Sequence, residues 1–287
     1  MSINNRYDFV MLFDVENGNP NGDPDAGNSP RIDSETGYGY ITDVCLKRKI
    51  RNYVELVCEG KEGYNILVKP DSSLNSKFTA AYEAEGLKTK EKGKKTEDVE
   101  KAREYMCKNY FDVRAFGAVM STGDDPCGIV RGPVQINFAR SISPINIQDI
   151  TITRQARTTD DRTATGGTEM GRKSLIPYGL YRAEGYISAA LANKSTNLSE
   201  EDVELIWKAI INMFENDHSA ARGKMCMRKL YVFKHDNVLG SCPSNILFDM
   251  ITVKQVSENA PRQISDYEIC EPEQSMMPEG VEFISKL

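Results

Sequence analysis

Residues that would point to a familiar catalytic chemistry are scarce in this 287-residue chain. It contains only two histidines, and neither lies beside a cysteine or serine in a pattern that would activate a nucleophile. The GxSxG and HExxH motifs and the Walker A loop are all missing. The sequence therefore gives no support to a serine hydrolase, a zinc peptidase or a P-loop enzyme, and we expect no cofactor.

Long apolar runs and paired cysteines are missing as well. No stretch approaches the roughly 20 apolar residues that a membrane-spanning helix needs, and residues 1–6 lack the apolar core of a signal peptide. The seven cysteines are odd in number and show no CxxC spacing, which is typical of reduced thiols. We therefore expect a cytoplasmic protein without a membrane partner.

The formal net charge of −6 is unevenly distributed along the chain. Residues 12–35 carry six acidic side chains and one basic one, and residues 257–287 carry seven acidic and two basic ones. Each of these segments has a charge of −5, so the rest of the chain is left with +4. The overall acidity therefore does not exclude an anionic partner such as a nucleic acid.

The hydrophobic pattern predicts strands and helices that two polar stretches interrupt. Apolar, aromatic and β-branched residues at 7–15 are typical of a central strand, and Ser199 with the acidic residues after it resembles a helix-capping box. Further strands are expected at 132–140, within 180–189, at 227–234 and at 246–256, and further helices at 43–58 and 96–109. Without the polar stretches and the last strand, the order is strand, helix, strand, strand, helix, strand, as in the split βαβ or ferredoxin-like fold.

The polar stretches are interpreted as insertions into one decorated α+β domain that spans residues 1–256. The first insertion covers about 60–130 and contains a helix, and the second covers about 141–177. The acidic residues 257–287 are expected to form a C-terminal tail outside this domain.

A loop rich in Asn, Gly and Pro is predicted at 17–30. Asn17, Asn19 and Asn21-Gly22 match the first six positions of a calcium-binding loop, but Asn28 stands where that loop needs a bidentate glutamate. Asn-Gly and Asp-Pro pairs are also ordinary turn formers. We therefore predict a structural loop and no metal site.

A basic face is predicted on the helix that begins near residue 43. At about 100° of rotation per residue, Lys47, Arg48 and Arg51 fall together opposite the apolar face. Neighbouring cations repel one another unless an anion lies opposite. The pattern therefore fits either a solvated helix face or a surface that binds an anionic ligand.

The second insertion is rich in arginine, threonine and glycine, and residues 131–182 carry eight basic against four acidic side chains. Guanidinium, hydroxyl and backbone N–H donors suit phosphate contacts, and an aromatic ring beside a cation can stack a base. The candidates outside the basic helix are Arg31, Arg114, Phe116, Arg154, Arg157, Arg162, Arg172, Arg222 and Lys224. RNA binding through backbone contacts is favoured over a protein scaffold with acidic partners, although no RNP1 signature indicates RRM-type stacking.

Several ordered segments are more specific than composition. They are Phe13-Asp14-Val15, Asn19-Pro20-Asn21-Gly22-Asp23-Pro24, Pro30-Arg31-Ile32-Asp33, Thr42-Asp43-Val44-Cys45-Leu46-Lys47-Arg48-Lys49-Ile50-Arg51, 111–117, 131–135 and 219–223. From about residue 6 to 256, the chain resembles the backbone subunit of type I CRISPR surveillance complexes, or Cascade. The resemblance is best to the type I-C form, the Csd-two/Cas-seven family of the RAMP superfamily.

The resemblance implies a modified RRM-like palm with a finger-like helical insertion and a thumb-like β-hairpin. It implies a non-catalytic subunit whose copies line up along the spacer part of a CRISPR RNA, beside other Cascade subunits. The thumb displaces one nucleotide at regular intervals, and the remaining bases pair with a target DNA strand. The alternative is a metal-dependent ribonuclease of the same superfamily, with Asp23, Asp25 or Asp33 as the acidic residue.

The resemblance also suggests roles for the basic residues. Lys47, Arg48 and Arg51 are expected to hold the guide backbone from the palm. Arg154, Arg157 and Arg162 are expected to act from the thumb. Arg31 and Arg114 are secondary candidates.

Overall fold

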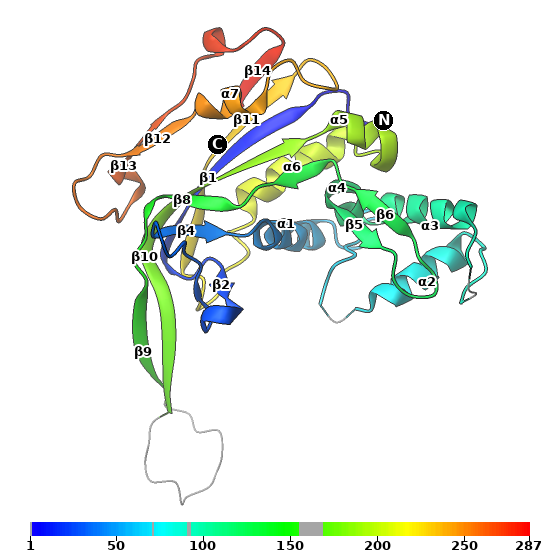
Figure 1. Cartoon of the computed structure of the whole chain (residues 1–287), viewed down its shortest axis with the longest axis horizontal. Coiled ribbons are helices and arrows are strands. Elements are labelled where there is room, and N and C mark those ends of the chain that lie inside the picture. The colour runs from blue at the N-terminus through cyan, green and yellow to red at the C-terminus, as the bar shows by residue number, and fades with distance from the viewer. Residues whose placement is uncertain (1, 71, 91–92, 155–168) are drawn as a thin grey trace, which may run out of the picture.

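The computed structural model describes the whole chain except residues 1, 71, 91–92 and 155–168 (Figure 1). At its centre, β1 (Tyr7–Gly18) lies between β10 (Glu169–Ile187) and β11 (Lys224–His235) and pairs with both in antiparallel register. The strand order is β14-β11-β1-β10-β8-β4, with β14 at Val281–Ser285, β8 at Ala139–Pro144 and β4 at Tyr38–Ile41. The predicted central strand and the mixed fold with an antiparallel sheet are confirmed.

Strand β1 is central because its side chains are apolar on both faces of the sheet. Its odd-numbered residues lie in the main core, and its even-numbered apolar residues lie in a second core on the other face. On the first face, Trp207 packs edge-on against Phe9 with ring centroids 5.2 Å apart, and on the second face Leu247 and Phe248 are buried. The covering helices are α1 (Asp43–Val57) and α6 (Glu200–Asn212) on the first face and α7 (Ser244–Asp249) on the second.

The two long helices begin where the sequence predicted, because a side chain caps each of them. Thr42 accepts the N–H of Cys45 at 3.3 Å and so starts α1. The predicted capping box at α6 is confirmed, since Ser199 and Asp202 each accept the backbone N–H of the other. The order β1, α1, β8, β10, α6, β11 is the predicted strand and helix order of the split βαβ unit.

Residues 60–131, called here the helical insertion, carry a hydrophobic core of their own. Phe78, Tyr82, Met106 and Cys127 are among its buried members. The insertion contains α2 (Leu74–Ala84), α3 (Thr96–Asn109), α4 (Phe111–Phe116), β5 (Gly117–Met120) and β6 (Gly128–Arg131). The predicted helix at 96–109 is confirmed as α3.

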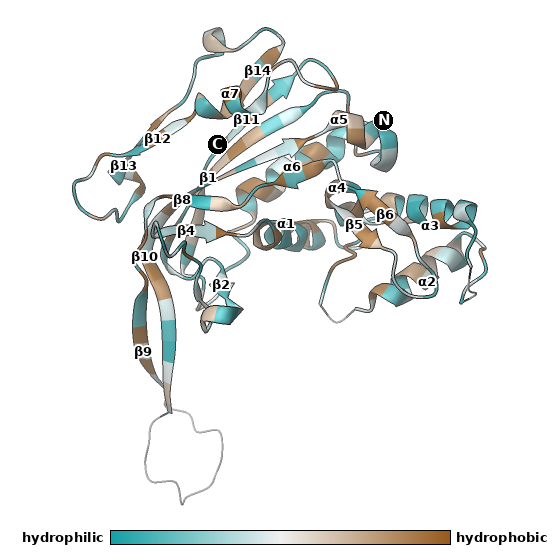
Figure 2. Ribbon diagram, viewed as in Figure 1, coloured by the Kyte–Doolittle hydropathy of each residue, from teal (hydrophilic) through white to brown (hydrophobic). Residues whose placement is uncertain are grey.

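A long β-hairpin leaves the sheet on the other side of α1 from the helical insertion (Figure 1). The hairpin consists of β9 (Gln148–Arg154) and residues 169–175 of β10, and the rest of β10 continues into the central sheet. Ile150 and Ile152 of β9 are exposed, and hydrophobic segments are visible on this strand in Figure 2. Short elements complete the fold: β7 (Val134–Ile136), α5 (Ala189–Leu191) and a π-helix at Ala192–Thr196.

Two expectations about the C-terminal part are wrong. The strand predicted at 246–256 is α7 followed by the short β12 (Thr252–Gln255), because the buried Leu247, Phe248 and Ile251 have helical spacing. The expected tail at 257–287 is folded instead: β13 (Tyr267–Cys270) pairs with β12, and β14 pairs with β11. Apolar residues spaced among the acids, such as Phe283 stacked on Tyr231, hold this segment to the sheet.

All seven cysteines are free thiols, as their spacing predicted. Burial raises the pKa of Cys107 to about 11, and burial raises the pKa of Cys127 to about 12, so both are neutral thiols in the core of the helical insertion. In the described part of the chain, no helix is long and apolar enough to cross a membrane.

Candidate nucleic-acid interface

The loop at 17–31 is held in one conformation by the short strands β2 (Gly22–Asp23) and β3 (Ser29–Pro30). Asn21 Oδ1 accepts hydrogen bonds from the backbone N–H and from the hydroxyl of Thr42, both at 3.0 Å. Asn19 Nδ2 donates to the carbonyl of Asn28 at 2.6 Å. The asparagine side chains therefore fold the loop and attach it to the N-terminus of α1, which agrees with the predicted structural role.

A second segment, residues 217–224, packs against this loop at backbone distance. A Cβ atom on Gly18 would lie 1.9 Å from the carbonyl oxygen of Arg222, so only glycine fits there. From the hairpin, Lys173 Nζ donates a hydrogen bond to the carbonyl of Ala220. Direct contacts thus connect α1, the 17–31 loop, the 217–224 segment and the base of the hairpin.

Two of the three cations predicted on α1 have acidic partners within the protein. Lys47 Nζ lies 2.9 Å from Asp43 Oδ2, one turn earlier on the helix. Arg51 Nε donates to Asp112 Oδ2 at 2.8 Å, and the Arg51 guanidinium lies over the Phe116 ring at 5.0 Å. Arg51 and Phe116 are 9% and 7% exposed. Both side chains hold α4 against α1, so this geometry gives no support to a guide contact or to base stacking, and those roles stay predictions.

Arg48 is the α1 cation whose donors are not all used. It is partly buried, and its Nη1 atom is buried without a hydrogen-bond partner among the described residues. Burial, and next the neighbouring Arg51 guanidinium, lower the pKa of Arg48, yet an arginine keeps its charge at neutral pH. A buried N–H without an acceptor costs about 1–3 kcal/mol. An anionic acceptor at Nη1 would remove this cost and balance the charge.

Arg31, like Arg48, has a buried donor nitrogen without an acceptor among the described residues. Its Nη1 lies 3.5 Å from Asp23 Oδ1, and its Nε is buried without a partner among the described residues. Because Arg31 closes the 17–31 loop, this donor lies on the segment that Asn21 fixes to α1. Arg31 was predicted as a secondary contact, and the structure makes it as strong a candidate as Arg48.

The predicted contacts at 222 and 224 are partly neutralised by nearby acids. Arg222 and Lys49 both form ion pairs with Asp217. Lys224 Nζ lies 3.4 Å from Glu16 Oε2, and both of these side chains are exposed. Surface pairs of this kind are worth little and open readily, so Arg222 and Lys224 stay predictions as accessory contacts.

The hairpin candidates can be placed only in part. Arg172 is exposed on β10 and lies opposite Thr151 of β9. Arg154 ends β9 and is paired in the ladder with Glu169. Arg157 and Arg162 lie outside the described residues. The hairpin assignment therefore stays a prediction for these arginines.

Arg114 is not a surface contact. Its guanidinium donates to both carboxylate oxygens of Asp202 at 2.9 and 2.8 Å, and its Nη1 donates to three backbone carbonyls of the helical insertion. The residue is 7% exposed. This side chain ties the helical insertion to the start of α6, and the structure gives no support to its predicted RNA contact, which stays a prediction.

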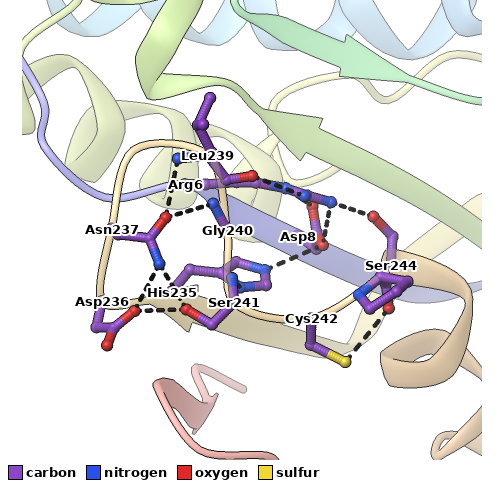
Figure 3. Close-up of polar contacts among 11 residues, drawn as sticks. Arg6, Asp8, His235, Asp236, Asn237, Leu239, Gly240, Ser241, Cys242 and Ser244 are labelled. Atoms are coloured by element: carbon purple, nitrogen blue, oxygen red, sulfur yellow. Dashed lines mark hydrogen bonds and ion pairs between the residues drawn. The ribbon is translucent and has the colours of Figure 1, made fainter.

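Neither histidine forms a nucleophile pair. Figure 3 shows His235 buried between Asp8 and the turn at 236–241: Nε2 lies 3.2 Å from Asp8 Oδ2, and Nδ1 accepts the backbone N–H of Ser241 at 3.0 Å. The Ser241 hydroxyl donates to Asp236 and not to the ring. Both ring nitrogens are thus used to fix the turn, and His218 is exposed. Among the described residues, no group of three or more His, Cys, Asp or Glu could hold a metal ion.

One cluster on the far edge of the sheet was missed by the reasoning from sequence. Tyr40, Phe138 and Arg140 gather beside a cavity of about 430 Å³. The alternation in β4 is the sequence signal that could have indicated this cluster. Tyr38 and Tyr40 are only partly buried, whereas Gly39 and Ile41, which alternate with them, are buried.

Comparison with known proteins identifies the chain's relatives. The family model of the CRISPR-associated protein Cas7 matches residues 5–271. A protein of Haloferax volcanii, described as CRISPR-associated protein Cas7, is 29% identical over an alignment of 232 residues, and the match covers 74% of this chain and 66% of the relative. The matched region therefore spans slightly less than two thirds of that relative's length.

A solved structure has a similar fold. It is a chain of a pre-nicking CRISPR RNA-guided surveillance complex, with a TM-score of 0.52 and 13% sequence identity over 79% of this chain and 78% of that one. At this low identity, the likeness concerns the fold alone.

Proposed function

Because the chain belongs to the CRISPR-associated protein Cas7 family, we propose that it is a CRISPR RNA-binding subunit of a surveillance complex. Copies of the chain line up along the spacer part of the guide RNA, beside other Cascade subunits, and each copy holds the backbone of a short segment. The bases left free pair with a target DNA strand. The proposal extends to the type I-C form, a cytoplasmic location and a role without catalysis.

The observation that carries this proposal is the pair of unfilled arginine donors, Arg31 Nε and Arg48 Nη1. Both belong to partly buried guanidinium groups on segments that the fold holds rigid. A phosphate at the exposed part of each guanidinium supplies the negative charge that these two groups lack. Contacts of this type position a strand without reading its sequence, as a guide-holding subunit requires.

The shape of the molecule supports the same proposal. The hairpin and the helical insertion lie on either side of α1 in Figure 1, with the β2 loop below it, as expected for a thumb, a finger and a palm. The hairpin exposes Ile150, Ile152 and Met170 beside Arg172. Exposed apolar residues next to a cation suit a hairpin that contacts both a neighbouring copy and RNA.

The alternative, a metal-dependent ribonuclease, gains no support from the acids proposed for it. Asp23 accepts the N–H of Asp25 at 3.2 Å and faces Arg31, and Asp33 accepts the N–H of Glu35 at 3.0 Å. These carboxylates already shape turns. Incubation of the assembled complex with complementary RNA and Mg²⁺ tests the alternative, and regular cuts that Asp33→Ala abolishes would establish it.

Purification with and without the two key donors tests the proposed function. We expect the wild-type chain to retain RNA of uniform length, and the Arg31→Gln/Arg48→Gln variant to lose most of it. Lys208→Gln is the matched control, because Lys208 is exposed on α6, and it should retain RNA like the wild type. A folded wild-type chain that purifies free of RNA and binds no single-stranded RNA at low salt would refute the proposal.

A further inference from the structure

An exposed aromatic pair lies at the edge of the central sheet. Tyr40 on β4 and Phe138 just before β8 have rings that are parallel to within 4°, with centroids 6.3 Å apart. Phe138 is 52% exposed. Ile41, which follows Tyr40, and Ala139, which follows Phe138, are both buried in the main core. Tyr40 therefore faces the side of the sheet away from α1, and the pair is not part of the core that α1 covers.

A cation borders this aromatic pair. Arg140 is exposed and lies directly opposite Tyr40 in the β4–β8 ladder. On its other side, Arg140 lies opposite Arg182 of β10. Arg182 is occupied, since it donates to the carbonyls of Phe248 and Ile251. Arg182 also forms an ion pair with Glu184 at 3.0 Å. After the backbone N–H of Glu35, the charge of Arg140 helps to lower the pKa of Asp33. Because Arg140 is exposed, its guanidinium is still open to an anion from solvent.

A carboxylate completes the cavity of about 430 Å³, which is also lined by Ile32, Ser34 and Tyr38. The backbone N–H of Glu35, and next the Thr36 hydroxyl, lower the pKa of Asp33, so this carboxylate is ionised at neutral pH. An ionised carboxylate accepts hydrogen bonds and donates none. The lining of one cavity thus offers a flat aromatic surface, a carboxylate that accepts hydrogen bonds, and a cation.

This combination selects a narrow class of ligand. A bare phosphate would meet Arg140 but would be repelled by Asp33 and would gain nothing from the rings. An aliphatic side chain of a second copy would use the rings but leave both charges unused. A nucleotide uses all three features, because its base stacks, its amino edge donates, and its phosphate is anionic.

We propose that the Tyr40–Phe138 cavity holds one unpaired base of the bound RNA, with Arg140 at the adjoining phosphate and Asp33 at the amino edge of the base. The site lies on the sheet face away from α1, so it is distinct from the donors of Arg31 and Arg48. This inference rests on the proposed RNA binding and adds a contact that recognises a base.

Fluorescence of single-stranded RNA that carries 2-aminopurine tests the proposal, because stacking on a ring quenches this base. We expect the wild-type chain to quench it and Phe138→Ala to abolish most of the quenching while weakening RNA affinity about 5- to 100-fold. The salt dependence of affinity should keep its wild-type slope in Phe138→Ala, because a ring releases no counterions. Arg140→Gln should instead reduce that slope by about 0.7.

Two further variants separate a base from an apolar protein partner. Phe138→Trp keeps an aromatic surface and should bind RNA like the wild type, whereas Phe138→Leu keeps only apolar surface and should behave like Phe138→Ala. Wild-type RNA affinity and quenching in Phe138→Leu would overturn the proposal. A loss of self-association in Phe138→Ala, measured by light scattering without RNA, would assign the site to a second copy. If the wild-type chain binds no RNA at all, the proposed function and this inference fail together; if only the Phe138 variants behave like the wild type, this inference alone fails.

Discussion

Two groups of arginines in this molecule look alike in sequence and differ in what they contact. At the junction with the helical insertion, Arg51 meets Asp112 and Arg114 meets Asp202 in buried ion pairs. On the loop and the exposed side of α1, Arg31 and Arg48 keep buried donors without partners among the described residues. The comparison teaches that a basic cluster in the sequence contains both arginines with a buried acidic partner and arginines with unfilled donors, and that only the fold separates the two.

The largest effect on stability is expected for the buried ion pair of Arg114 and Asp202. Arg114→Ala leaves the carboxylate of Asp202 buried without its partner, which should lower the free energy of unfolding by about 3–5 kcal/mol. Urea denaturation measures the loss. Replacing both partners, as in Arg114→Met/Asp202→Asn, removes the unpaired charge, keeps a side-chain oxygen for the capping box at α6 and should recover part of the stability. A loss below about 1 kcal/mol in Arg114→Ala would show that this pair does not hold the helical insertion.

A smaller loss is expected for Arg51→Ala, about 1–3 kcal/mol. Asp112 keeps the backbone N–H groups of Leu67 and Val68 as donors at 2.8 and 3.1 Å, so its carboxylate remains partly satisfied. The matched change on the same helix, Arg48→Ala, removes a buried donor that has no acceptor and should therefore not lower stability. Equal losses of unfolding free energy in Arg51→Ala and Arg48→Ala, measured by the same urea titration, would show that the two arginines do not differ in their contribution to the fold.

The smallest effect concerns pH and the core of the helical insertion. A cysteine in the unfolded chain has a pKa near 8.5, whereas burial raises the pKa of Cys107 to about 11 and of Cys127 to about 12. Between about pH 8.5 and 11 the unfolded state therefore loses protons that the folded state keeps, and stability falls as pH rises.

Urea midpoints at pH 8 and pH 9 measure this loss, which we expect to be on the order of 1 kcal/mol. The Cys107→Ala/Cys127→Ala variant should lose less stability between these two pH values than the wild type. Cys270→Ala, which removes an exposed thiol, is the control and should show the wild-type loss. An unchanged pH dependence in the double variant would remove these thiols as its cause.

The sequence predicted the central strand and the main helices of the fold, whereas the partners of its basic residues depended on the tertiary structure. Local signals were sufficient for β1, for the start of α6 at Ser199 and for α3, because each depends on residues within one or two turns. The roles of Arg51 and Arg114 could not be predicted, since their partners lie 61 and 88 residues further along the chain. No pattern near an arginine shows that a distant carboxylate will be buried beside it.

The aromatic cluster at the sheet edge illustrates the same limit. Tyr40 and Phe138 are far apart in sequence and meet only because β4 pairs with β8. Strand pairing of this kind depends on the tertiary fold. In the sequence alone, neither aromatic residue differs from an ordinary strand residue, so their contact could not be predicted. Residues brought together by the sheet were therefore the ones that sequence reasoning missed.

The most direct test of the RNA contact is the salt dependence of affinity for a single-stranded RNA. We predict that the Arg31→Gln/Arg48→Gln variant shows a slope of log K against log[salt] that is shallower by about 1.4, because each phosphate contact with a single strand contributes about 0.7. The folded Arg51→Gln variant should keep the wild-type slope. Parallel lines for the wild type and the Arg31→Gln/Arg48→Gln variant would show that these two donors hold no phosphate.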